Sequence, residues 1–153
     1  MSSEARSDQR PCPGQICWLE VPCTDPDRAF AFYHEVFGWD AAPGSQGPMP
    51  GYIDGVDSIL MFQKGSMYGA FVKMSNSDGV AAVADSANTA KMPILPSFAV
   101  EDIDKTTAIV ERNLGKVHIP KTPIAGGTMG HCARFIDTEG NIIAVWSSPD
   151  ASK

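Results

Sequence analysis

The chain has 153 residues, 43% of them hydrophobic and 20% charged, so it is long enough for one domain with a buried core. Its formal net charge is −6 and its basic residues form no stripe, which argues against DNA or RNA as a main partner. No stretch approaches the roughly 18 apolar residues of a membrane span, and the polar N-terminal segment lacks the apolar centre of a signal peptide. We therefore expect a cytoplasmic protein.

The four cysteines, at positions 12, 17, 23 and 132, lack the spacing of a metal site. No pair follows the CxxC pattern of common structural zinc sites. A disulfide framework is not expected in a chain without a secretion signal. We interpret the cysteines as reduced, mostly buried thiols, and a cysteine nucleophile is not favoured because no base neighbours Cys17 or Cys132 in the sequence.

The first half of the chain predicts a strand, a helix and further strands. Residues 1–13 are polar and contain two prolines, which is typical of a disordered arm, and residues 16–21 are a strand candidate. Asp25 suits the N-cap of a helix, Pro26 its first position and Gly38 its end. Strands are predicted over residues 58–63 and 69–74, residues 41–56 predict a loop with room for one short strand, and residues 75–94 predict a connection.

The second half repeats this order at a constant offset. Asp102 lies 77 positions after Asp25, and Gly115 lies 77 positions after Gly38, so the cap and the end of a second helix match those of the first. The expected elements are a strand at 95–100, a helix to about Leu114, a strand at 116–119, a flexible Gly-rich loop at 126–130, and a hairpin of strands 132–136 and 141–146 around the turn 137–140.

Several stretches of the sequence resemble the vicinal oxygen chelate superfamily, which includes glyoxalase I, extradiol dioxygenases and bleomycin-resistance proteins. They are CWLEVP, TDPDRAFAFY and VFGW within 17–39, FAVEDID and NLGK within 98–116, and FIDTEGNII at 135–143. The resemblance implies an α+β fold of two tandem βαβββ modules, whose curved mixed sheets form a cup with the helices outside. The expected domain is 14–148, with module one at 14–74, a linker at 75–94 and module two at 95–148, preceded by the arm 1–13 and followed by a tail at 149–153. Family members pair their modules within one chain or between two, so the resemblance also allows a homodimer.

In the metal-dependent members, the metal ligands lie on the first and last strand of each module. The matching positions are Trp18, Leu95, Ala144 and either Gly69 or Ala70. None of these side chains offers the imidazole or carboxylate that a divalent metal needs. We therefore expect neither a metal nor another cofactor, and a metal-dependent glyoxalase or dioxygenase would need atypical ligands such as Glu20 and His131.

Glu20 shares a face of its strand with Trp18, because alternate residues of a strand point the same way. If Trp18 faces the cup, so does Glu20. A carboxylate in a partly apolar cup can act as a general acid or base, or it can be the structural partner of a nearby base. Ser97 lies 77 positions after Glu20, so we expect it to face the same cavity and to donate a hydrogen bond to a ligand.

The predicted hairpin strand 132–136 contains Arg134, whose side chain is expected to face the same cup. Its two residues at 133 and 135 are apolar and suit the face beneath the helices, which leaves Cys132 and Arg134 facing the cup. Arg134 either binds an anionic ligand or forms an ion pair with Glu20. His131 follows the Gly-rich loop near the expected mouth of the cup, where it is either a proton shuttle or a structural residue.

Four aromatic residues are candidates for the wall of the cup or for ordinary core: Trp18, Phe62, Tyr68 and Trp146. The leading hypothesis is a metal-independent lyase, isomerase or cyclase acting on a small apolar or aromatic molecule, with Glu20 as acid or base and Arg134 and His131 assisting. One alternative is a non-catalytic protein that binds or sequesters such a molecule, as resistance proteins of this superfamily do. The other alternative is a metal-dependent enzyme with the atypical ligands.

Overall fold

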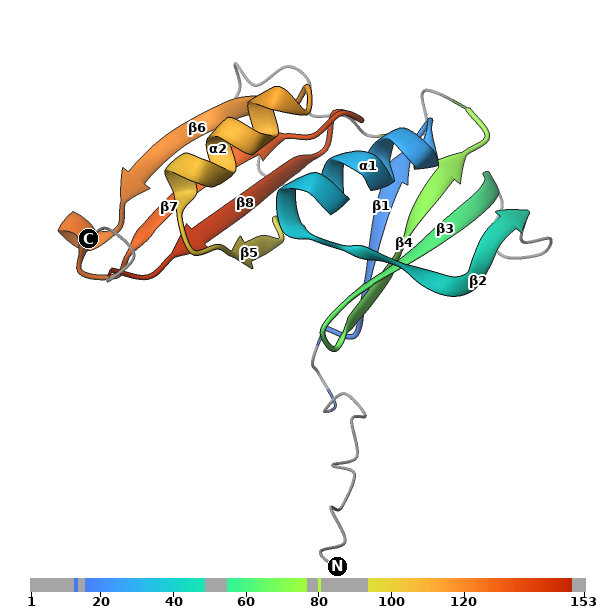
Figure 1. Ribbon diagram of the computed structural model, residues 1–153, viewed down its shortest axis with the longest axis horizontal. Helices are drawn as coiled ribbons and strands as arrows, with labels where there is room; N and C mark the ends of the chain where they lie inside the picture. Colours follow the sequence, from blue (N-terminus) through green and yellow to red (C-terminus); the bar gives the residue numbers. More distant parts are fainter. Residues whose placement is uncertain (1–12, 14–15, 49–54, 77–79, 81–93, 150–153) are drawn as a thin grey trace, which may run out of the picture.

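The structure is a computed structural model that describes residues 13, 16–48, 55–76, 80 and 94–149. Within these residues it has two four-stranded mixed sheets and two α-helices, an α+β arrangement of two modules (Figure 1). Neither of these helices is long and apolar enough to cross a membrane. Nearly all of the predicted arm, most of the predicted linker and most of the predicted tail lie outside the described residues.

Both modules have the predicted order of one strand, one helix and three strands. Module one consists of β1 (Trp18–Cys23), α1 (Pro26–Phe37), β2 (Asp40–Pro48), β3 (Val56–Lys64) and β4 (Met67–Met74). Module two consists of β5 (Ser97–Ala99), α2 (Ile103–Arg112), β6 (Lys116–Pro123), a short 3-10 turn (Ala125–Gly127), β7 (His131–Ile136) and β8 (Ile142–Ser147). The sheet orders are β1-β4-β3-β2 and β5-β8-β7-β6. The first strand of each module along the chain pairs in parallel with the last, β1 with β4 and β5 with β8. The two modules therefore share one topology, as the constant offset predicts.

The helices begin where the sequence predicts. The Asp25 side chain accepts a hydrogen bond from the Arg28 N–H at 3.1 Å, and Asp102 does the same for the Lys105 N–H at 3.0 Å. Gly38 ends α1 with a φ of 67°, in the left-handed region that favours glycine.

Two local predictions need correction. The second helix, predicted to reach about Leu114 and to end at Gly115, ends at Arg112, and Leu114 has a left-handed φ of 68°. Gly115 is needed for a close approach instead, because a Cβ there would lie 2.7 Å from side-chain atoms of Phe32 and Val110. The region expected to be mostly loop contains the nine-residue strand β2, whose Gly and Pro are tolerated at the edge of a sheet.

One core serves both modules. The helices α1 and α2 lie next to each other on the same side of the two sheets (Figure 1). Phe32 and Tyr33 of α1, with Ile103 and Val110 of α2, are 2% exposed or less. These side chains belong to a single hydrophobic cluster that also contains residues of both sheets, so the modules are joined by apolar packing.

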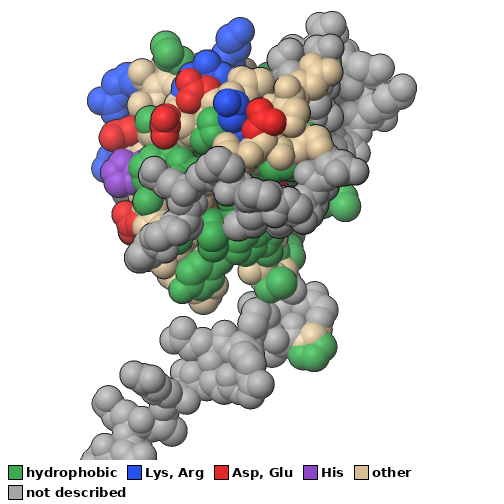
Figure 2. Space-filling view, turned by 90° about the vertical axis from the view of Figure 1, so that its right-hand side faces the viewer, with side chains coloured by type: hydrophobic (Ala, Val, Ile, Leu, Met, Phe, Trp, Pro, Cys, Tyr) green, Lys and Arg blue, Asp and Glu red, His purple; other side chains and the backbone are tan. Residues whose placement is uncertain are grey.

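The sheets have a second face, which is turned away from α1 and α2 and is called here the far face. On β1, Val21 and Cys23 are buried in the helix-side core, so Trp18 and Glu20 point to the far face. Seen from the module-one end, charged side chains gather toward the top of the folded part and hydrophobic side chains gather toward its bottom (Figure 2). The far face of module one includes two large exposed aromatic residues, Trp18 and Tyr68.

Candidate ligand-binding cleft

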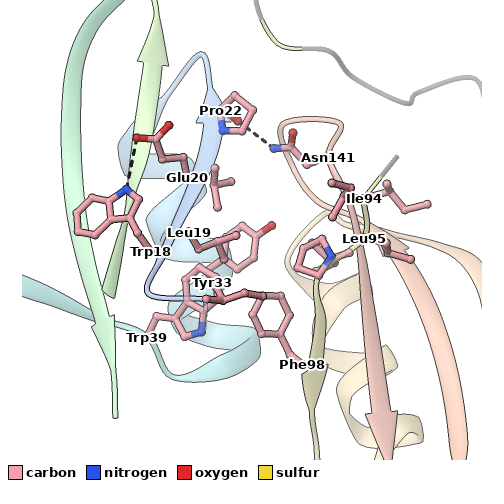
Figure 3. A pocket seen from close by; sticks show the side chains of 15 residues that line it. Trp18, Leu19, Glu20, Pro22, Tyr33, Trp39, Ile94, Leu95, Phe98 and Asn141 are labelled. Carbon is pink, nitrogen blue, oxygen red and sulfur yellow. Dashed lines mark hydrogen bonds between the residues drawn. The ribbon is translucent and has the colours of Figure 1, made fainter. Parts of the chain in front are cut away.

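A cleft of about 480 Å³ lies between the modules, where β1 faces β5 and the start of β8 (Figure 3). Residues 18–22 line it from module one, and residues 94–96, Phe98 and 141–143 line it from module two. Glu20 is the one charged side chain among the described residues that line it. A mostly apolar cleft of this volume is typical of small-molecule sites.

Aromatic rings form the inner end of the cleft. Trp39 is 1% exposed and stacks between Tyr33 and Phe62, with ring centroids 4.4 Å and 4.2 Å away. Phe98 of β5 packs edge-on against Trp39, with 5.4 Å between the centroids. Since close-packed stacked rings resist displacement, this end of the cleft is rigid and apolar.

Glu20 and Trp18 give the cleft its polar edge on the module-one side. The Trp18 indole N–H donates to the Glu20 carboxylate at 3.4 Å, as Figure 3 shows. Both residues are exposed, and both line the cleft. This contact is consistent with the prediction that the two side chains share a face of β1.

The turn between β7 and β8 closes one side of the cleft. The Asn141 side chain donates to the Pro22 carbonyl at 2.9 Å, which links module two to β1 (Figure 3). Asp137 is buried and accepts hydrogen bonds from the Tyr33 hydroxyl at 2.8 Å and from the Asn141 side chain at 3.0 Å. Burial raises the pKa of Asp137 in spite of these hydrogen bonds, and burial beside Asp137 also raises the pKa of Tyr33.

A second link holds this turn against the start of α1. The Glu139 carboxylate accepts from Arg28 Nε at 2.8 Å and from Arg28 Nη2 at 3.0 Å. It also accepts from the backbone N–H groups of Thr24 and Asp25, each at 3.1 Å. The Glu139 side chain is 0% exposed, so this charge is held entirely by its partners.

The residues at the four implied metal positions do not fit a metal ion. Trp18 lies on β1, Ala144 on β8 and Ala70 on β4, and none of these side chains, nor that of Leu95, carries a metal-binding atom. Among the residues that the structure describes, no group of three or more His, Cys, Asp or Glu side chains could hold a metal. The donor set therefore gives no support to a metal-dependent reaction.

Four of the predicted site residues lie together on the far face of module two. Ala144 pairs with Ser97 of β5 on one side and with Arg134 of β7 on the other. Trp146 of β8 pairs with Cys132 of β7. Ala133 and Phe135 are buried in the helix-side core, as predicted, and therefore Arg134 and Cys132 point to the far face.

His131 and Phe62 lie elsewhere. His131 has the same parity on β7 as the core residue Ala133, so it points to the opposite side from Arg134. Its Nδ1 atom is buried and has no hydrogen-bond partner among the described residues, and its ring lies beside Gly127 of the Gly-rich loop. Phe62 is fully buried in the core beside Trp39, and therefore it does not line the cup.

The sequence did not identify the module-two wall of the cleft. Leu95 was singled out only as a former metal position, and Ile94, Pro96, Asn141 and Ile142 were not singled out at all. These residues line the cleft with β1 because the two modules pack together, and such packing between distant segments leaves no recognisable pattern in the sequence around them. Asn141 is the exception, since an asparagine after a tight turn is a common turn-stabilising residue.

A model of the Glyoxalase/Bleomycin resistance protein/Dioxygenase superfamily matches residues 15–145. The chain belongs to this superfamily. A glyoxylase-like domain-containing protein from Didymella fabae is 28% identical to this chain over 142 residues. The match covers 89% of this chain and 95% of the relative.

Solved structures of the superfamily have the same fold. Glyoxalase I from Zea mays is 16% identical with a TM-score of 0.64, covering 89% of this chain and 46% of the maize chain. The fosfomycin resistance protein FosX from Listeria monocytogenes is 12% identical with a TM-score of 0.63, covering 88% and 90%. TnmS3, an antibiotic binding protein from a Streptomyces species, is 19% identical with a TM-score of 0.56, covering 88% and 95%. These identities are low, so the likeness establishes the fold alone.

Proposed function

We propose that this protein binds a small, largely apolar organic molecule in the cleft between its modules. The observation that carries the proposal is the cleft itself, with about 480 Å³, an apolar lining, a rigid aromatic end and one carboxylate at its edge. Burial of apolar ligand surface stabilises such a complex, while Glu20 and Trp18 offer a polar group for orientation.

Two proteins of similar fold support this proposal. TnmS3 is an antibiotic binding protein, and a FosX structure contains 1S,2S-dihydroxypropylphosphonic acid. Both therefore hold a small organic molecule on the same type of scaffold. The fold alone does not fix a ligand, so the proposal for this chain depends on its own cleft.

The proposal can be tested with N-phenyl-1-naphthylamine, a neutral dye whose fluorescence rises in an apolar site. We expect saturable binding to the wild-type protein. Leu95→Trp adds bulk to the wall of the cleft and should weaken binding at least about tenfold, a loss comparable to the contacts of one apolar side chain. The matched control is Leu114→Trp, at a leucine that is 80% exposed and outside the cleft. Equal affinity of the two variants would remove the proposal.

A second candidate function is catalysis with Glu20 as general acid or base, in a lyase, isomerase or cyclase reaction. The observation that favours it is the position of Glu20 on the wall of the cleft, where the Trp18 N–H holds its carboxylate. Small molecules that co-purify with the protein would be incubated with it in deuterated water and followed by mass spectrometry. Conversion or deuterium uptake that is lost in Glu20→Gln supports catalysis, and unchanged molecules favour binding without chemistry.

A further inference from the structure

Three residues form a row across the far face of module two, and their chemistry suits an anion. Ser97 of β5 pairs with Ala144 of β8, and Ala144 pairs with Arg134 of β7, so the three side chains point to one face. We propose that this row holds the oxyanion, such as a carboxylate, of a ligand whose apolar part occupies the cleft. The inference rests on the proposed binding function and specifies the class of ligand.

Arg134 is a cation in an apolar setting. Its register neighbours are Ile119 on β6 and Ala144 on β8, and Cys132 and Ile136 flank it on the same face of its own strand. It is partly buried, and its side chain forms no hydrogen bond or ion pair with any residue that the structure describes. A guanidinium has five N–H donors, and none of the Arg134 nitrogens is among the buried atoms without a partner, so these donors are open to solvent and to a ligand. An oxyanion would supply two acceptors in the geometry that a guanidinium prefers.

The residue in the middle of the row is small, because Ala144, which is 7% exposed, carries only a methyl group. Neighbouring strands lie about 4.8 Å apart, so the backbones of Ser97 and Arg134 are roughly 10 Å apart with only the Ala144 methyl group between them. The exposed Ser97 offers a hydroxyl donor from the other side. Trp146 follows Ala144 on the same face of β8 and is 39% exposed, so its ring borders the row.

The row is continuous with the cleft. Ile142 lines the cleft and lies two residues before Ala144 on β8, on the same face and about 7 Å away. A molecule of ordinary ligand size that packs against Ile142 can therefore reach Arg134 with one end.

Module one has a different row at the equivalent place. There Glu20 pairs with Ala70, and Ala70 pairs with Met61. A carboxylate thus stands where module two has Ser97, and a thioether stands where module two has Arg134. Because like charges repel, an anionic ligand is oriented with its charged end on module two and its apolar body toward β1.

The test uses two dyes with the same ring system. 8-Anilinonaphthalene-1-sulfonate carries an oxyanion, and N-phenyl-1-naphthylamine lacks it. We expect Arg134→Leu to weaken binding of the sulfonate about tenfold or more, the loss of one charge-assisted contact, and to change binding of the neutral dye less than twofold. Arg134→Lys keeps the charge without the planar donor pair and should give an intermediate affinity. Arg112→Leu, at an exposed arginine of α2, is the matched control and should change neither affinity.

The outcomes separate this inference from the proposed function. Unfolding curves and circular dichroism first establish that each variant is folded, since the sulfonate dye also binds partly unfolded chains. Equal loss of both dyes in Arg134→Leu, or no loss of the sulfonate, would overturn the anion site while the cleft remains. If the wild-type protein binds neither dye, the proposed function and this inference both fail.

Discussion

Glu139 joins the two modules, and its replacement should weaken the fold measurably. Its side chain is 0% exposed and accepts from Arg28 Nε at 2.8 Å and Nη2 at 3.0 Å, and from the backbone N–H groups of Thr24 and Asp25 at 3.1 Å. Glutamine has nearly the same shape but no charge, and its side-chain NH₂ group would face one of these donors. At least one of these donors would then lose its acceptor.

The expected size of the effect follows from these contacts. A hydrogen bond to a charged group contributes about 1.5–3 kcal/mol, and solvent screens the Arg28 share because Arg28 is 48% exposed. We therefore expect Glu139→Gln to lower the free energy of unfolding by about 2–3 kcal/mol. For a chain of this size that corresponds to a decrease in Tm of roughly 4–12 °C.

Urea unfolding at pH 7, followed by circular dichroism, measures this change. Asp104→Asn is the control, because it removes a charge in the first turn of α2 and its ion pair with Lys121, at side chains that are 74% exposed for Asp104 and 31% exposed for Lys121. The control should change stability by less than about 0.5 kcal/mol. A change of less than about 1 kcal/mol in Glu139→Gln would refute the reasoning.

The same contacts predict how this difference depends on pH. Burial raises the pKa of Glu139, but the hydrogen bonds from Arg28 and from the Asp25 and Thr24 amides outweigh burial and hold the pKa below its ordinary value. A carboxyl group with a lowered pKa stabilises the fold above its unfolded-state pKa of about 4.3, and this is lost as the pH falls through the folded-state pKa. The gap between wild type and Glu139→Gln should therefore shrink below about pH 4. A gap that stays constant in acid would contradict this account.

Three further predictions concern the core and the thiols. Tyr33→Phe removes the hydroxyl donor of a buried 2.8 Å hydrogen bond and should cost about 1–3 kcal/mol in urea unfolding; no measurable change would show the bond to be dispensable. Gly69→Ala places a Cβ against a backbone oxygen of β1 and should cost more than about 3 kcal/mol or prevent folding, whereas a stable variant would contradict the close approach. Burial and nearby carboxylates raise the pKa of Cys23 to about 12, so iodoacetamide at pH 8 should label the exposed Cys17 and spare Cys23, as peptide mass spectrometry can measure; equal labelling would argue against this burial.

Much of the fold was predictable because its signals are local. Asp25 and Pro26 mark the start of α1 and Gly38 marks its end, and each of these signals lies next to the helix end that it determines. Asp102 marks the start of α2 in the same way, 77 positions after Asp25. The end of α2 was less predictable, because tertiary packing against Phe32 decides the role of Gly115. The edge strand β2 was also obscured, since its composition is that of a loop.

The site was predictable only as far as strand alternation reaches. Alternation placed Glu20 with Trp18 and put Arg134 on the far face. Counting three residues back from Arg134 would also have placed His131 on the opposite face, but its place after the Gly-rich loop suggested the cup instead. The cleft itself arises where two modules pack, and a homodimer, a cytoplasmic location and the roles of the site residues stay predictions.

A crystal structure of the protein with bound N-phenyl-1-naphthylamine tests the central claim most directly. We predict that the dye lies between β1 and β5, in contact with Trp18, Leu95 and Ile142. A second cavity of about 580 Å³ near the start of α2, bordered by Lys64 and Lys105, provides the clearest competing location. Density for the dye in that cavity alone, or no bound dye at saturating concentration, would contradict the account.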